Sequence, residues 1–260
     1  MLLTIDVGNS ETVIGYWNGS SLLQVDRTAT VSSQPVQEWI EYFKKIHSNE
    51  LAKNPDFFKT IDVIIASVVP GLDDCLSSTF NQLQVSKVLS VNLDLKFSFA
   101  IDKSKFSSIG ADRLANAAGA SSLYGDNVIV VDFGTAITFC LLLGNEYVGG
   151  VISPGIHTSL NALVDRAAKL PKIKYMKKNS ILMNNTVDSI QCGMYFGWKG
   201  LVREILNELN YVNFQKNITD VKVIATGGIS IDLGFTHELF TIVDPSVTMK
   251  GLYRIYKDNQ

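Results

Sequence analysis

The sequence is poor in the residues that usually build disulfide frameworks and metal centres. Its 260 residues include only three cysteines and three histidines. The cysteines are Cys75, Cys140 and Cys192; they are widely spaced and form no Cys-x-x-Cys pair, and no two histidines have the spacing of metal ligands. We therefore expect neither a disulfide framework nor a zinc site, and this cysteine usage fits a cytoplasmic protein.

The sequence also lacks an excess of charge of either sign. It has 23 basic and 25 acidic side chains, which gives a formal net charge of −2. Proteins that bind nucleic acid or anionic lipid normally carry a basic excess. We therefore expect neither of these partners.

Long hydrophobic runs are missing as well. The most apolar stretch, 128–143, is shorter than the ~20 residues that a membrane helix needs, and Asp132, Gly134 and Thr135 interrupt it. The chain reaches Asp6 without the basic and apolar regions of a signal peptide. We expect no membrane segment and a cytoplasmic location.

The sequence does have the composition and patterning of a globular α/β protein. Hydrophobic residues make up 46% of the chain, and β-favouring apolar runs alternate with amphipathic helical patterns. The predicted strands are 2–5, 12–17, 63–69, 87–91, 128–131, 137–143, 147–152 and 221–225. One helix is predicted to start near residue 35, and four others to cover about 73–83, 113–123, 158–169 and 186–209. The fold class is therefore α/β.

An internal repeat is the most informative feature of the sequence. Residues 4–13 (TIDVGNSETV) and 130–139 (VVDFGTAITF) both read as an apolar strand, Asp-x-Gly, a small polar turn and a second strand. Duplication of such a unit implies two related lobes that face one another. We place the lobes at 1–113 and 114–260.

The repeated turn has the groups that a nucleotide site needs. A carboxylate at the end of a buried strand requires a partner such as a cation or backbone N–H groups. A glycine two residues later lets backbone amides approach an anion. One such turn alone is more often an ordinary Asx-turn hairpin. Two copies in matching positions favour a site for a nucleoside triphosphate with its metal ion.

Four further segments are candidates for function or assembly. Asp112 and Arg113 follow Gly110 at the start of an Ala-rich helix, where Asp112 either caps the helix or acts as a general base. A strand ends at Gly227 and Gly228, which permit close approach of a flat ligand or form an ordinary turn. Three glycines in the long helix suggest close packing against a helix of the same chain or of a second subunit: Gly193, Gly197 and Gly200. Five lysines are expected in a solvated loop or, less often, an anion-facing rim: Lys169, Lys172, Lys174, Lys177 and Lys178.

The ordered set of motifs resembles the type III pantothenate kinase family over almost the whole chain. The motifs are DVGNS at 6–10, GADR at 110–113, VDFGTA at 131–136, GGVISPG at 149–155 and ATGG at 225–228. The resemblance implies the actin-like ATPase fold of acetate and sugar kinases, with two ribonuclease H-like lobes of duplicated βββαβα units. It also implies a homodimer, ATP, Mg²⁺, a monovalent cation (K⁺ or NH₄⁺), and phosphorylation of pantothenate to 4′-phosphopantothenate in coenzyme A biosynthesis.

The resemblance also implies roles for individual residues. Asp112 is the implied catalytic proton acceptor, Asp132 the ligand of the monovalent cation, and Asp6 the contact to the Mg²⁺-bound phosphates. The implied ATP-binding residues are Asp6, Val7, Gly8, Asn9, Ser10, Glu11, Thr12, Val13, Thr135, Gly227 and Gly228. The implied pantothenate-binding residues are Gly110, Ala111, Asp112, Arg113 and Thr186.

Two departures from the family pattern affect these expectations. Lys103, Lys105 and Phe106 stand where the family often has a Tyr and an Asn-Pro, so a substrate contact differs here. Glu11 adds a carboxylate to a turn that is expected to face phosphates, which weakens ATP binding unless the side chain points away.

Two alternative functions remain at this point. One is another kinase of the same superfamily that acts on a sugar or a carboxylate, and the other is a non-catalytic ATP-binding accessory or regulatory protein. A protein that only binds ATP needs no base, so the Asp112-Arg113 pair favours an enzyme.

Overall fold

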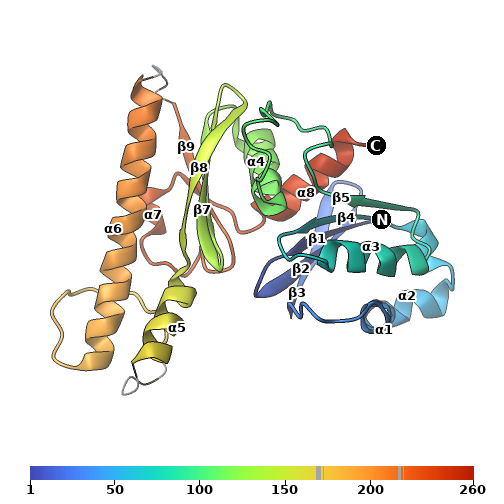
Figure 1. Cartoon of the computed structure of the whole chain (residues 1–260), viewed down its shortest axis with the longest axis horizontal. Coiled ribbons are helices and arrows are strands. Elements are labelled where there is room, and N and C mark those ends of the chain that lie inside the picture. The colour runs from blue at the N-terminus through green and yellow to red at the C-terminus, as the bar shows by residue number, and fades with distance from the viewer. Residues whose placement is uncertain (168–170, 172, 216–217, 219) are drawn as a thin grey trace. The chain divides into compact units, whose positions relative to one another are not determined.

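The computed structural model describes residues 1–167, 171, 173–215, 218 and 220–260. They form two compact units (Figure 1). Unit 1 is built from Met1–Ser98, Asp102–Gly119 and Thr248–Gln260, and unit 2 from Phe99–Ile101 and Ala120–Val247. Each unit combines segments that are distant in the sequence, so the units do not correspond to a single boundary in the chain. The predicted lobe boundary after residue 113 therefore stays a prediction.

Unit 1 contains a five-stranded sheet in the order β3-β2-β1-β4-β5. The strands are β1 (Leu2–Val7), β2 (Glu11–Asn18), β3 (Ser21–Ala29), β4 (Asp62–Ser67) and β5 (Lys87–Ser90). The first three pair antiparallel as a meander, and β4 and β5 run parallel to β1. Between them lie α1 (Val36–Ile46), α2 (Ser48–Lys53), a 3₁₀ turn (Phe57–Thr60) and α3 (Leu72–Gln82).

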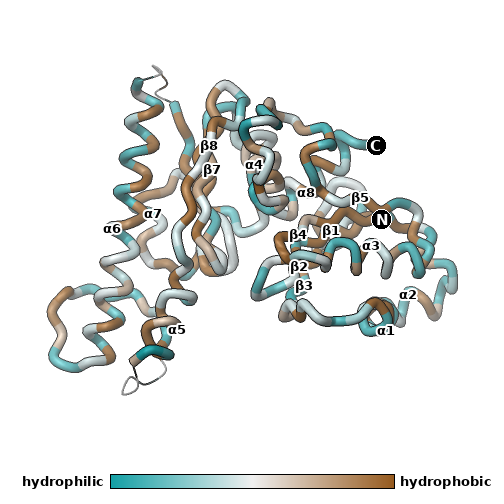
Figure 2. Tube along the Cα trace, in the orientation of Figure 1, coloured by the Kyte–Doolittle hydropathy of each residue, from teal (hydrophilic) through white to brown (hydrophobic). Residues whose placement is uncertain are grey.

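Helices α1 and α3 cover one face of this sheet. Their buried aromatic side chains Trp39, Phe43 and Phe80 form one core with alternate residues of β1, such as Ile5 and Val7. Figure 2 shows the hydrophobic colouring concentrated along β1 and β4. This alternation leaves Asp6 on the other face, because successive side chains of a strand point to opposite sides.

Unit 2 repeats the strand order of unit 1. Its sheet runs β8-β7-β6-β9-β10, with an antiparallel β6-β7-β8 meander and with β9 and β10 parallel to β6. The strands are β6 (Val128–Phe133), β7 (Ala136–Leu143), β8 (Glu146–Pro154), β9 (Lys222–Thr226) and β10 (Ile242–Val243). The helices are α5 (Ile156–Arg166), α6 (Thr186–Gln215) and α7 (Thr236–Leu239). The predicted α/β fold and the duplication are confirmed; the predicted end of the 158–169 helix, Lys169, lies outside the described residues.

The long helix α6 packs along one face of the unit 2 sheet (Figure 1). Its buried Tyr195, Trp198 and Val202 share a core with Ile129 and Val131 of β6. The glycines of α6 lie on an exposed part of the helix: a Cβ added at Gly193, Gly197 or Gly200 would meet no atom of the described chain within 4 Å. Packing of these glycines within the chain is therefore not found among the described residues.

The C-terminal helix α8 (Val247–Asp258) returns to unit 1. A Cβ on Gly251 would lie 1.8 Å from the carbonyl oxygen of Ala115 in α4 (Ala111–Tyr124), so only glycine permits this close helix contact. Tyr253 stacks on Trp17 of β2 with a ring separation of 4.4 Å. None of the helices in the described ranges is long and apolar enough to cross a membrane.

Candidate active site

The first Asp-x-Gly turn joins β1 to β2 in unit 1. Asp6 is half-buried near the end of β1, while Asn9 and Ser10 are exposed at the turn. The Gly8 N–H donates to the Glu11 carbonyl at 3.0 Å, and a Cβ on Gly8 would lie 3.1 Å from that oxygen. The turn is therefore tight, and its exposed end carries the amide and hydroxyl groups suited to phosphate oxygens.

The Glu11 carboxylate is paired across the sheet rather than free in the turn. Its Oε2 lies 3.2 Å from Nη1 of Arg27 on β3. The guanidinium offsets the negative charge that Glu11 brings to the turn. The departure from the family pattern at this position thus comes with a compensating cation on the neighbouring strand.

The Gly110–Arg113 segment lies beside the end of the same sheet. Gly110 precedes α4, and a Cβ on it would lie 2.5 Å from Asp112 Oδ1 and 3.5 Å from Val68 Cγ1. Val68 follows β4 and donates its N–H to the Val7 carbonyl at 3.1 Å. Unit 1 therefore brings the Asp112 segment to the strand end that carries the first turn.

The Asp112 carboxyl has the electrostatics of a proton acceptor. Burial raises its pKa above the usual aspartate value, and the neighbouring Arg113 charge and N–H partly oppose the rise. The Arg113 backbone N–H donates to Asp112 Oδ1 at 2.7 Å, which holds the carboxylate in place. A carboxylate with a raised pKa is a stronger base, which suits proton abstraction from an alcohol.

The segment before Gly110, where the sequence departs from the family, forms a compact turn. The Asp102 carboxylate accepts from the Ser104 N–H at 3.0 Å and from the Lys105 N–H at 3.2 Å. The Lys105 ammonium lies 5.1 Å from the Phe106 ring centroid. Lys103 and Lys105 are exposed, so this turn adds positive charge close to the Asp112 segment.

The second Asp-x-Gly turn joins β6 to β7 in unit 2. The Thr135 carbonyl accepts from the Gly155 N–H at 2.9 Å and from the Thr158 hydroxyl at 2.7 Å, both at the start of α5. A Cβ on Gly155 would lie 2.3 Å from the Gly134 carbonyl oxygen. The strand-to-helix passage after β8 therefore fixes the turn that carries Thr135.

Gly227 lies directly against Asp132. It has φ +96°, and a Cβ there would lie 2.4 Å from Asp132 Oδ1 and 2.6 Å from the Phe133 nitrogen. Within the described ranges no group of three or more His, Cys, Asp or Glu side chains could hold a metal ion. Two buried hydroxyl oxygens, on Thr138 and Thr226, have no hydrogen-bond partner in the described part of the chain. One carboxylate with neutral oxygen atoms around it fits a monovalent cation better than a divalent one.

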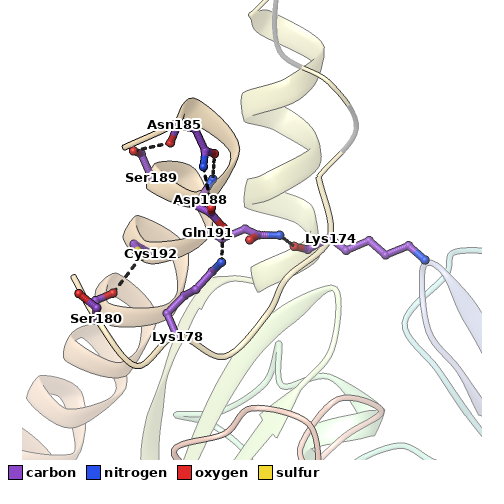
Figure 3. Close-up of polar contacts among 8 residues, drawn as sticks. All are labelled: Lys174, Lys178, Ser180, Asn185, Asp188, Ser189, Gln191 and Cys192. Carbon is purple, nitrogen blue, oxygen red and sulfur yellow. Dashed lines mark hydrogen bonds and ion pairs between the residues drawn. The ribbon is translucent and has the colours of Figure 1, made fainter. Parts of the chain in front are cut away.

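Thr186 is exposed at the first turn of α6. Asn185 caps this helix: its Oδ1 accepts from the Asp188 N–H at 2.9 Å, and its Nδ2 donates to Asp188 Oδ2 at 2.7 Å. Lys178 forms an ion pair with Asp188 at 2.5 Å (Figure 3). Of the expected lysine loop, Lys178 is thus paired rather than solvated, whereas Lys169 and Lys172 lie outside the described residues.

Additional contacts bind the preceding segment to α6. Gln191 Nε2 donates to the Lys174 carbonyl at 3.0 Å, and the Cys192 thiol donates to the Ser180 carbonyl at 3.1 Å (Figure 3). These bonds fix the approach to the helix start where Thr186 lies. Cys192 is a buried free cysteine.

The predicted site residues fall into two groups. Unit 1 brings together the 6–13 turn and the 110–113 segment, and unit 2 brings together Asp132, Gly227 and the Thr135 turn. Convergence of the two groups on one bound nucleotide stays a prediction. Sequence reasoning missed the structural roles of Val68, Gly155 and Arg27; each acts through a contact across the fold that local spacing does not reveal.

The architecture belongs to the actin-like ATPase class of folds. The MreB5 structure of Spiroplasma citri bound to ADP aligns with 98% of this chain and 96% of its own, with a TM-score of 0.54 and 11% identity. Duplicated strand orders with an Asp-x-Gly turn after the first strand of each sheet agree with this class.

Comparison of the amino-acid sequence with known proteins identifies the family. The family model for type III pantothenate kinase matches residues 2–208. The type III pantothenate kinases of Koribacter versatilis and Halalkalibacterium halodurans are 37% and 35% identical; each alignment covers 100% of this chain, and 96% and 100% of the relative. The chain belongs to the type III pantothenate kinase family, transferases that phosphorylate pantothenate with ATP in coenzyme A biosynthesis.

Proposed function

We propose that this chain transfers the γ-phosphoryl group of ATP to the primary hydroxyl of pantothenate, with Asp112 as the general base. The hydroxyl oxygen bonds to the γ-phosphorus, the bond from that phosphorus to the β–γ bridging oxygen breaks, and ADP leaves. The hydroxyl proton passes to the Asp112 carboxylate. Family membership supports the substrates, and the buried carboxyl held by Gly110 and Arg113 supports the base.

Positioning and charge stabilisation provide most of the rate enhancement in enzymatic phosphoryl transfer. The transition state is loose, so the protein contributes little covalent chemistry. We assign the phosphate contacts to residues 6–13, to Thr135 and, on the adenosine side, to Gly227 and Gly228. Arg113 would bind the pantothenate carboxylate as a guanidinium fork. Gly110, Ala111 and Thr186 would complete the pantothenate site.

The proposal includes two cations. Asp6 would hold the Mg²⁺ that accompanies ATP, and Asp132 would hold K⁺ or NH₄⁺. When bound, such ions neutralise phosphate charge during transfer. Two observations support these assignments. Asp6 is half-buried near the end of a strand, and the backbone of Gly227 lies close to the carboxylate of Asp132.

The observation that carries the proposed mechanism is the placement of Asp112 beside the strand end of the first turn. A coupled assay of ADP release tests it, with and without pantothenate, in KCl and then in NaCl. We expect release that depends on pantothenate, with 4′-phosphopantothenate formed in equal amount and detected by mass spectrometry. Equal release with glucose or acetate in place of pantothenate would instead assign the chain to another activity of the superfamily.

We also propose that the enzyme works as a homodimer in the cytoplasm. The exposed glycines of α6 support a second copy as the partner, because exposed glycine destabilises a helix that nothing covers. Sedimentation of wild type and of Gly197→Leu tests this. We expect a dimer that the leucine weakens and that Gly197→Ala leaves intact; a wild-type monomer at micromolar concentration would contradict the proposal.

A further inference from the structure

Buried hydroxyl groups without partners lie beside Asp132 in unit 2. Thr226 is 0% exposed and Thr138 is 8% exposed, yet neither hydroxyl oxygen has a hydrogen-bond partner in the described ranges. A buried hydroxyl without a partner costs free energy, so each such group needs an explanation, and a bound ion or an ordered water is one.

The sheet register places both threonines next to Asp132. Asp132 pairs with Thr138 across the β6–β7 ladder and with Thr226 across the β6–β9 ladder. Directly paired residues of neighbouring strands point to the same face, with Cβ atoms about 4.5–5.5 Å apart in an antiparallel pair. The three side chains therefore form a row of oxygen atoms across one face of the sheet.

The internal repeat supplies a control for this arrangement. In unit 1 the equivalent carboxylate, Asp6, pairs with Val13 on one side and with Ala66 on the other. Both of those neighbours are apolar. The same fold element thus surrounds its aspartate with methyl groups in one copy and with hydroxyl groups in the other, so the hydroxyls do not follow from the needs of the fold.

We propose that the hydroxyl oxygens of Thr138 and Thr226 are ligands, together with the Asp132 carboxylate, of the monovalent cation at this site. The inference rests on the proposed function, in which Asp132 holds that cation. One carboxylate and two neutral hydroxyls give the site a single negative charge, which a monovalent ion neutralises. Neutral oxygen ligands replace the hydration shell of K⁺ in selective sites of proteins.

Thermal unfolding in KCl and in choline chloride of equal ionic strength tests the inference without using activity. For wild type we expect the melting temperature to be higher in KCl, because an ion that binds only the folded state stabilises it. Thr138→Val and Thr226→Val should need at least tenfold more K⁺ for half of this gain. In choline chloride they should melt no lower than wild type, because the change removes an unpartnered buried hydroxyl.

Matched variants separate a ligand from a structural hydroxyl. Thr138→Ser and Thr226→Ser keep the oxygen and should keep the K⁺ response. Thr79→Val removes a buried hydroxyl of unit 1 that donates to the Cys75 carbonyl at 2.9 Å, so it should lower the melting temperature equally in both salts. A wild-type K⁺ response in both valine variants would overturn the inference, as would a wild type that does not respond to K⁺.

The pantothenate-dependent release of ADP by wild type is measured in parallel. Kinase activity with an unchanged K⁺ response in the valine variants overturns only the assignment of the hydroxyls. Absence of kinase activity overturns the proposed function, whereas the melting experiment still reports the cation site.

Discussion

Gly110 makes room for the carboxylate of Asp112: a methyl group on Gly110 would lie 2.5 Å from Asp112 Oδ1. The proposed base is therefore positioned by the absence of a side chain two residues earlier. Val68 closes the other side of this space, 3.5 Å from the same methyl position.

Gly110→Ala is expected to displace the Asp112 carboxylate and to lower kcat at least tenfold, with a small change in the KM for ATP. The reason is that a positioned base contributes roughly 10²- to 10⁴-fold to a rate. Steady-state kinetics with ATP and pantothenate measure the effect. If Asp112 is the target, Gly110→Ala added to Asp112→Asn lowers kcat no further; an additive loss would contradict this account.

The raised pKa of Asp112 predicts an acid limb in the pH profile. The base must be deprotonated to accept a proton, so activity falls as the pH drops through its pKa. Because burial raises this pKa, the limb of kcat/KM should lie above the ordinary aspartate value of about 3.9. Profiles of wild type and Asp112→Asn test this; the variant should have low activity and no such limb, and a limb retained in the variant would assign it to another group.

The Glu11–Arg27 pair predicts an effect on ATP binding rather than on stability. Exposed ion pairs contribute little to folding, so Arg27→Ala should change the melting temperature by little. Without the guanidinium, the Glu11 charge repels the phosphates, and the KM for ATP should rise several-fold. Glu11→Gln added to Arg27→Ala should restore the wild-type KM; failure to restore it would mean that Arg27 acts on ATP in another way.

The buried His47 predicts a loss of unit 1 stability in acid. Its Nδ1 lies 2.9 Å from the Phe43 carbonyl oxygen, and its Nε2 is buried with no partner in the described part of the chain. Burial lowers its pKa, although the hydrogen bond with the Phe43 carbonyl and the charges of Glu50 and Asp26 oppose this. The unfolded chain therefore binds a proton more readily, and stability falls as the pH drops below about 6.5.

Urea unfolding at pH 7.5, 6.5 and 5.5 measures this dependence. His47→Phe keeps an aromatic ring beside Phe57 and Phe58, whose centroids lie 5.2 and 5.6 Å from the histidine ring. The variant should show a smaller fall in the urea midpoint between pH 6.5 and 5.5. An equal fall in both proteins would assign the acid sensitivity to other groups.

Gly251 predicts a severe loss of stability on substitution. Because a Cβ there would lie 1.8 Å from the Ala115 carbonyl oxygen, Gly251→Ala forces α8 away from α4 and should cost several kcal/mol, in the upper range for single substitutions. Trp17 reports the change, since it stacks on Tyr253 of α8. A lower melting temperature with altered tryptophan fluorescence is expected, and a wild-type melting curve would contradict the close helix contact.

The sequence predicted the parts of the fold that depend on local pattern. The Asp-x-Gly repeat identified both turns, and the apolar runs identified β4 and β6. It did not predict β3, because residues 21–29 alternate without a buried face: Leu23 is 64% exposed and Val25 is 40% exposed. The sequence did not predict α8 either. Its Gly251 is required because of the close contact with α4, which the local sequence does not show.

The proposed cation site shows the same limit at the level of single residues. Asp132 could be identified from the repeat, but its neighbours Thr138 and Thr226 come from strands on either side of β6. Their proximity depends on the register of two ladders, one of which joins residues far apart in the chain. Residue spacing along the chain does not contain this information.

The return of α8 to unit 1 determines when the N-terminal half of the molecule can be completed during synthesis. The hydroxyl of Thr4, in the first strand, donates to the Met249 sulfur at 3.3 Å, and the Lys87 ammonium donates to the Asn259 carbonyl at 2.7 Å. Synthesis must therefore pass residue 249 before β1 gains this contact from α8. A nascent chain stalled or cleaved before residue 248 would contain every strand of the unit 2 sheet but would lack the α8 residues that pack in unit 1, which also carries the proposed phosphate turn.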